Sequence, residues 1–164
     1  GVGGLLSTSE TAPTMPAGFI YKRRLGWVYN HSDDNLQNFI QVGLSRDKTY
    51  WWVESNAAYC RVVDNGTSVS SHTSVDVATR VPPTAYEYYI SCITNVVGGS
   101  SVTIKANGFY LNGVNGNHIG IEYGQGRHAD RWFVCNQVTA PSFDYITYGS
   151  ANLYADIKGW RETI

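Results

Sequence analysis

The residue types that bind transition metals are present in this chain, but their spacing does not bring them together. Four histidines and three cysteines form no Cys-x-x-Cys or His-x-x-x-His pair, the spacing that places two ligands on one metal ion. The segment 31–35, HSDDN, carries oxygen ligands, yet it lacks the spaced acidic residues and the later glutamate of a calcium loop. We therefore expect no metal site and no cofactor.

Catalytic side chains are no better supported by their spacing. The chain has no Gly-x-Ser-x-Gly turn, and its glycine-rich stretches 113–120 and 123–130 lack a Walker lysine and a following helix. A serine and a histidine could still meet in space, although no motif selects them. The carboxylates that could in principle form a glycosidase pair are also not singled out by spacing; they are Asp33, Asp34, Glu54, Glu87, Glu122 and Asp130. We predict that the chain is not an enzyme.

Aromatic residues are the unusual feature, at 13% of the chain. Trp27, Trp132 and Trp160 lie in apolar, strand-like stretches and are expected to pack. In a strand the adjacent Trp51 and Trp52 must point to opposite faces, so at most one of them faces the core. An outer ring beside polar groups suits either sugar binding or contact between subunits. Both interpretations stay open.

The candidate ligand-binding residues follow from this reasoning. They are aromatic or polar side chains in the 49–55 stretch and in or beside two loops, 107–117 and 124–130, which are rich in glycine and polar residues. The set is Tyr50, Trp51, Trp52, Tyr110, Asn112, Asn115, His118, Arg127 and His128.

Charge and hydropathy exclude other partners. A net charge of −1 and a pI near 6.4 lack the basic excess that phosphate neutralisation needs, so no nucleic acid is expected. No apolar run is long enough to cross a membrane, and no secretion signal is visible. The cysteines Cys60, Cys92 and Cys135 are odd in number and lie in apolar stretches. They are expected to be free, buried thiols of a protein made in a reducing compartment.

Strand periodicity dominates the pattern of apolar residues. The stretches 101–106, 118–124 and 152–160 alternate apolar and polar side chains, as half-buried strands do. Further strands are expected in 19–30, 38–44, 49–55, 57–63, 73–78, 85–94, 131–139 and 143–149. Turn residues separate them at 33–35, 64–66, 98–99, 112–113, 115–116 and 148–150.

Many short strands without crossover helices predict an all-β fold, an antiparallel β-sandwich that is jelly-roll-like. Residues 1–18, rich in Gly, Ser, Thr and Pro, are expected to be an extended lead-in or linker. Residues 19–164 are expected to form a single β-sandwich domain.

Three segments resemble a known family when taken together. Residues 5–30 (LLSTSETAPTMPAGFIYKRRLGWVYN), 74–94 (SVDVATRVPPTAYEYYISCIT) and 143–164 (FDYITYGSANLYADIKGWRETI) are similar to the C-terminal domains of tailed-bacteriophage virion proteins. The shared features are the LLST, TAPT-like and YKRR-G pattern, the V-P-P-T-A turn and the closing hairpin. They cover about half the chain in the family's order, and none of them is a binding motif.

The resemblance implies a β-sandwich domain of a phage tail fibre, spike or head fibre, located in the virion and made in the bacterial host cytoplasm. It implies a homotrimer joined to an upstream stalk and bound to a host-surface glycan or protein. The alternatives are a purely structural capsid-decoration or fibre-cap domain and a polysaccharide depolymerase.

Overall fold

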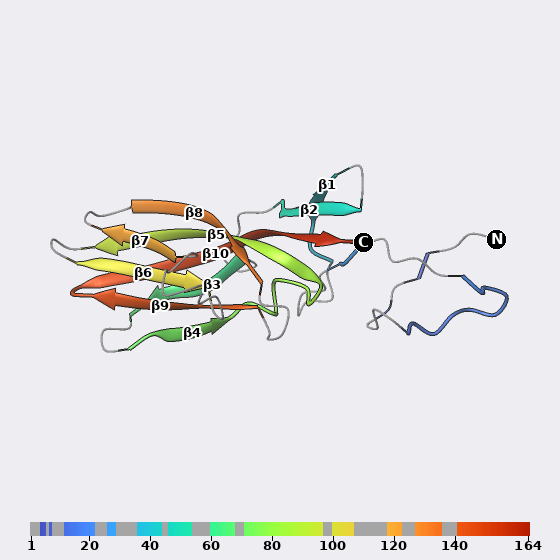
Figure 1. Ribbon diagram of the computed structural model, residues 1–164, viewed down its shortest axis with the longest axis horizontal. Helices are drawn as coiled ribbons and strands as arrows, with labels where there is room; N and C mark the ends of the chain where they lie inside the picture. The colour runs from blue at the N-terminus through green and yellow to red at the C-terminus, as the bar shows by residue number, and fades with distance from the viewer. Residues whose placement is uncertain are drawn as a thin grey trace, which may run out of the picture.

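The computed structural model describes twelve separate parts of the chain, namely residues 4–5, 7, 12–21, 26–28, 36–43, 46–53, 60–67, 71–96, 100–106, 118–122, 127–135 and 141–164. Ten strands lie within them (Figure 1): β1 (Phe39–Val42), β2 (Asp47–Trp52), β3 (Arg61–Gly66), β4 (Thr73–Asp76), β5 (Ala85–Val96), β6 (Ser101–Ala106), β7 (His118–Glu122), β8 (Arg127–Val134), β9 (Ser142–Tyr148) and β10 (Ala151–Thr163).

The strands form two antiparallel sheets. The larger sheet has the order β1-β2-β10-β5-β8, with β3 also paired to β10, and the smaller sheet has the order β4-β9-β6-β7. From β3 onward the pairing is that of one long folded hairpin, because β3 pairs with β10, β4 with β9, β5 with β8 and β6 with β7. This is the wrapping of a jelly roll. The predicted all-β sandwich is therefore confirmed, and β1 and β2 extend its larger sheet.

The core lies between the two sheets and follows the predicted alternation. In β10 the side chains of Leu153, Ala155 and Ile157 are buried, and the intervening polar side chains point to the other face. The Tyr88 hydroxyl donates a hydrogen bond of 3.0 Å to the carbonyl oxygen of Ser142, which ties the two sheets together. Each large apolar side chain buried here stabilises the fold by about 1.5–3 kcal/mol.

Three expectations about single segments were wrong. The loop expected at 124–130 includes the start of β8, which begins at Arg127. The stretch 19–30 was predicted to be a strand, but its described residues, 19–21 and 26–28, belong to none. The turn predicted at 64–66 lies inside β3. Asn65 does adopt the left-handed backbone conformation that a turn residue favours, with φ of 55°. It sits where the register between β3 and β10 shifts, so the local signal marks an irregular strand pair.

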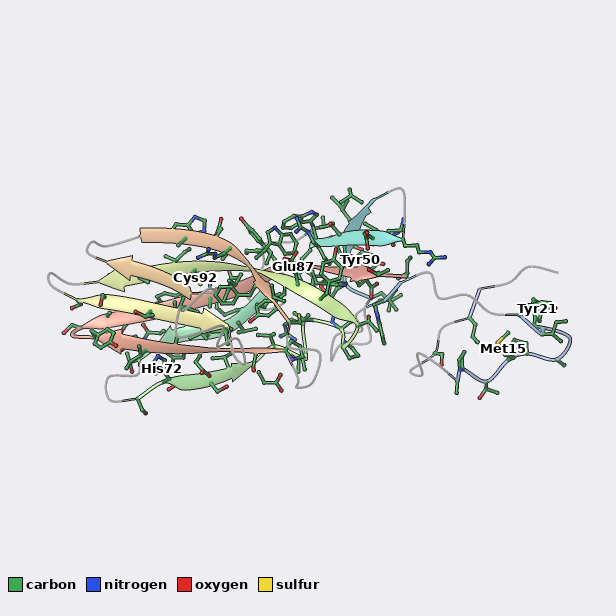
Figure 2. The ribbon with its side chains drawn as sticks, in the orientation of Figure 1. Met15, Tyr21, Tyr50, His72, Glu87 and Cys92 are labelled. Carbon is green, nitrogen blue, oxygen red and sulfur yellow. The ribbon has the colours of Figure 1, made fainter. Side chains whose placement is uncertain are left out.

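The N-terminal arm, residues 12–21, lies outside the sandwich. Figure 1 shows it beyond the end of the sandwich that carries β1, β2 and the C-terminus, and Figure 2 places Met15 and Tyr21 there. The chain joins the sandwich at Trp27, whose indole Nε1 donates a hydrogen bond of 2.8 Å to Thr84 Oγ1. The Thr84 hydroxyl in turn donates to the buried carboxylate of Glu162 at 2.6 Å.

All three cysteines are free and buried, as predicted. Burial raises the pKa of Cys92 far above its usual range and that of Cys135 to about 12. Since the thiolate is the reactive form, both thiols are chemically inert in the folded chain at neutral pH.

The thiols provide a test of the fold. We expect Ellman's reagent at mildly alkaline pH to label the native chain slowly, because folding hides the thiols and suppresses their ionisation. The same chain in denaturant should react quickly at all three cysteines. Fast labelling of the native chain, followed by absorbance, would contradict this packing.

Candidate recognition surface on the outer face of the larger sheet

Strand β2 sends its two adjacent tryptophans to opposite faces. Tyr50 is fully buried and stacks on Trp160, with ring centroids 4.8 Å apart and planes 6° apart. Trp52 lies on the same inner side, 5.0 Å from Trp160. Alternation then places Trp51 on the outer face, as the sequence predicted for one of the pair.

The strand register places Trp51 in a row of paired residues that runs across the sheet. Its members, in order across five strands, are Ile40, Trp51, Gly159, Tyr89 and Trp132. Gly159 leaves the central place in this row empty. A Cβ atom there would clash with the carbonyl oxygen of Tyr50 and come within 3.0 Å of the Trp51 ring. The indole can therefore extend over β10 towards β5 and β8.

Three rings meet above this glycine, and we call Trp51, Tyr89 and Trp132 the outer aromatic cluster. Their centroids are 5.2 Å apart for Trp51 and Tyr89, 5.3 Å for Trp51 and Trp132 and 5.2 Å for Tyr89 and Trp132. All three contacts are tilted or edge-to-face, the arrangement that aromatic quadrupoles favour. Each ring is only partly buried, so the cluster still presents aromatic surface to solvent.

Arg161 closes one side of the cluster. Its guanidinium carbon lies 3.9 Å from the centroid of the Trp132 ring, and Nη1 donates a hydrogen bond of 2.7 Å to Glu87 Oε2. Glu87, labelled in Figure 2, lies on β5 opposite Arg161 of β10. The ion pair and the cation–π contact together fix the orientation of the Trp132 ring.

Polar side chains occupy the next part of the same face, and we call the following residues the outer polar cluster: Arg61, Ser91, His128, Asp130, Asp156 and Lys158. The Asp156 carboxylate is at its centre, 2.5 Å from Arg61 Nε and 3.1 Å from Lys158 Nζ. Ser91 pairs across the strands with Asp156 on one side and Asp130 on the other. The polar cluster therefore borders the aromatic cluster directly.

The polar cluster contains a serine, a histidine and an aspartate, but they do not form a catalytic triad. Ser91 Oγ lies 2.8 Å from His128 Nε2, and Asp130 Oδ1 lies 3.0 Å from the same nitrogen. A triad needs the carboxylate on the other ring nitrogen, so that one nitrogen accepts the serine proton while the other donates to the carboxylate. Here the arrangement orients polar groups and does not activate Ser91.

Tyr89 links the two clusters. Burial raises the pKa of its hydroxyl, and so does the Asp130 carboxylate, both by its charge and by accepting a hydrogen bond from that hydroxyl. The phenol therefore stays protonated and remains a donor at neutral pH. Farther along the face, Asn65 Oδ1 accepts hydrogen bonds from Asn152 Nδ2 at 2.7 Å and from the Tyr154 hydroxyl at 2.9 Å.

The structure separates the residues that sequence reasoning grouped as a ligand site. Trp51 and His128 lie on the outer face, whereas Tyr50 and Trp52 pack into or against the core. Tyr110, Asn112 and Asn115 lie outside the described residues. The backbones of His118 and Arg127 begin β7 and β8, and their side chains are also outside what is described.

Sequence reasoning missed several side chains of this surface as a group, including Tyr89, Ser91, Asp156 and Arg161. Alternation in 85–94 does place Tyr89 and Ser91 on the face opposite Tyr88. Nothing in a single sequence says which strand lies beside another, so the meeting of these side chains could not be read from it.

No group of side chains suited to holding a metal ion occurs among the residues that the structure describes. In that same part of the chain no helix is long and apolar enough to cross a membrane. Comparison with models of protein families, with curated proteins and with solved structures found no match to this chain.

The row across the sheet predicts a sensitive position at Gly159. We expect Gly159→Ala to lower the free energy of unfolding by about 1–3 kcal/mol, because the new methyl group meets backbone and the Trp51 ring. Urea denaturation followed by tryptophan fluorescence measures the change. Gly4→Ala is the matched control, since nothing lies within 4 Å of a Cβ there. An unchanged midpoint for Gly159→Ala would show that Trp51 does not rest on this glycine.

Proposed function

We propose that this chain is a non-enzymatic recognition domain of a bacteriophage virion appendage, a fibre or spike tip, that binds a host-surface glycan. The observation that carries the proposal is the outer aromatic cluster beside the outer polar cluster on one face of a β-sandwich. The placement in a virion is supported by the resemblance of residues 5–30, 74–94 and 143–164 to phage virion domains.

The two clusters supply the two kinds of contact that a sugar needs. Aromatic rings cover the apolar C–H face of a pyranose, and neighbouring polar side chains exchange hydrogen bonds with its hydroxyl groups. Trp51 offers partly exposed ring surface, while the exposed side chains of Asp130, in the adjoining row, and His128, in the row after it, offer acceptors and donors. Because these side chains stand on paired strands, the surface is already arranged before a ligand arrives.

The charges of this surface favour a neutral glycan. Arg61 and Lys158 both contact Asp156, Arg161 contacts Glu87, and His128 contacts Asp130. Each of the three cations Arg61, Lys158 and Arg161 thus has a carboxylate beside it. An acidic polysaccharide would have to compete with those carboxylates, whereas an uncharged sugar leaves the ion pairs in place.

Binding to purified bacterial polysaccharides tests the proposal. We expect the 164-residue chain to bind at least one neutral glycan on an array of lipopolysaccharides and capsular polysaccharides. Trp51→Ala should weaken that binding by about tenfold or more, because the stacking surface is lost. Trp51→Phe should retain part of the affinity. Isothermal titration with the glycan found on the array measures all three proteins.

Tyr148→Ala is the matched control, since Tyr148 is an exposed aromatic residue in the smaller sheet. Its affinity should equal that of the unmodified chain, and circular dichroism should show that every variant is folded. If Trp51→Ala binds as tightly as the unmodified chain, the outer aromatic cluster is not the site. If no polysaccharide binds, or if new reducing ends appear during incubation, the proposed function is wrong.

A structural role is the second candidate, and two exposed side chains favour it. Ile40 is 54% exposed and Val42 is 48% exposed, and their pairing with β2 puts both on the same face as Trp51. A capsid-decoration or fibre-cap domain would bury this apolar surface between copies. In that case Trp51→Ala lowers the assembled mass in light scattering and leaves binding to bacterial cells unchanged.

A further inference from the structure

The N-terminal arm carries apolar side chains that its own sandwich does not cover. Ile20 is 83% exposed and Tyr21 is 86% exposed, and Phe19 before them is exposed too. Figure 2 shows Tyr21 beyond the end of the sandwich. Large neighbouring apolar side chains left in water are typical of a surface that docks on something else. These three residues also have high strand propensity, yet they form no strand in the single chain.

Strand β1 is an edge that lacks the usual protection. Within the described residues it pairs with β2 alone, so its other side presents backbone donors and acceptors. Natural edge strands are commonly blocked by charged side chains. The strands β3, β4, β7 and β8 all carry charged residues, whereas the β1 sequence, FIQV, carries none.

The contrast with β8 shows what a protected edge looks like in this molecule. Arg131 pairs with Ile90, whose side chain is buried. Strand alternation therefore directs Arg131 to the inner face of the sheet, yet its side chain is exposed. A charge placed in this way disfavours the addition of another strand. No such charge occurs at β1, where Ile40 and Val42 are exposed instead.

We propose that Phe19–Tyr21 of one copy adds as an extra strand to the free edge of β1 in a second copy. The arm and β1 suit each other, because residues 12–21 and 39–42 contain no charged residue. Backbone hydrogen bonds supply affinity in this mode, and exposed apolar side chains on both partners become buried. Every copy carries one arm and one edge, so the contact is head-to-tail and closes into a ring where the rotation between copies allows.

We call the contact between Phe19–Tyr21 of one copy and β1 of another the joint. The joint is separate from the proposed glycan site. It uses the arm and the unpaired edge of β1, whereas the glycan contacts lie on the outer face over β2, β10, β5 and β8. A chain that cannot assemble should still bind a glycan through its own outer face. Loss of assembly and loss of glycan binding are therefore independent results.

Light scattering during gel filtration of the 164-residue chain tests the proposal. The unmodified chain is expected to have at least twice the 18.1 kDa mass of one copy over a wide range of concentrations. An arm variant, Ile20→Lys with Tyr21→Lys, and an edge variant, Ile40→Lys with Val42→Lys, should each have the mass of one copy. Tyr148→Lys is the control and should keep the assembled mass, because Tyr148 is exposed in β9 of the other sheet.

Mixing the two lysine variants gives the decisive result. The arm variant keeps an intact edge and the edge variant keeps an intact arm, so one native joint can form between them. The other joint would bring lysines together and should stay open. We expect the mixture to reach twice the mass of one copy and no more.

Three results would overturn the proposal: an unmodified chain with the mass of one copy at all concentrations, an arm variant that keeps the assembled mass, or a mixture that stays at the mass of one copy. A symmetric contact between outer faces gives the second of these results, because the arm variant keeps its own outer face intact. If the edge variant fails to fold by circular dichroism, the arm variant decides alone, since its substitutions lie outside the sandwich.

Discussion

The alternation of side chains along β10 is the constraint on which the rest of the structure depends. This strand pairs with β2, β3 and β5, and its inward side chains form the middle of the core. Between Ile157 and Gly159 the register shifts, so Lys158 and Gly159 together occupy the space opposite a single partner residue. Without this bulge the second half of β10 would turn Trp160 outward and Gly159 into the core. With it, the indole stacks on Tyr50, and the glycine lies beneath the outer aromatic cluster.

Local patterns predicted the strands, because alternation and turn residues act over a few positions. The stretches 101–106 and 152–160 became β6 and most of β10, and the buried thiols of Cys60, Cys92 and Cys135 followed from their apolar neighbours. Failures occurred where a distant partner decides the outcome. The signal at 64–66 is correct about the backbone of Asn65, but β10 keeps that segment within a strand. The stretch 19–30 has the composition of a strand, and its described residues have no partner strand in the single chain.

The same distinction explains the candidate site. Opposite directions for Trp51 and Trp52 follow from strand geometry alone, and the structure agrees. The joining of Trp51 to Tyr89 and Trp132 depends on the order and register of four strands, which no local pattern carries. Register also explains why Tyr50, one of the predicted ligand-binding residues, is not part of the surface. Tyr50 pairs with Trp160 across the strands, and the two rings fill the core. The resemblance to phage virion domains stays a prediction, and it concerns where the protein works more than how.

The pairing of β3 with β10 has a consequence for how the chain reaches its native state. Jelly-roll wrapping joins segments from opposite ends of the domain, and such non-local topologies fold slowly, because long loops must close before their contacts contribute. Three strands of the larger sheet, β2, β3 and β5, pair with β10, which follows all of them in sequence order. Until β10 has paired, β2, β3 and β5 lack their shared neighbour, and their apolar faces are exposed to water. Pairing of β10 is therefore the step that completes the larger sheet, and a chain that has not reached it carries unpaired strand edges that favour aggregation.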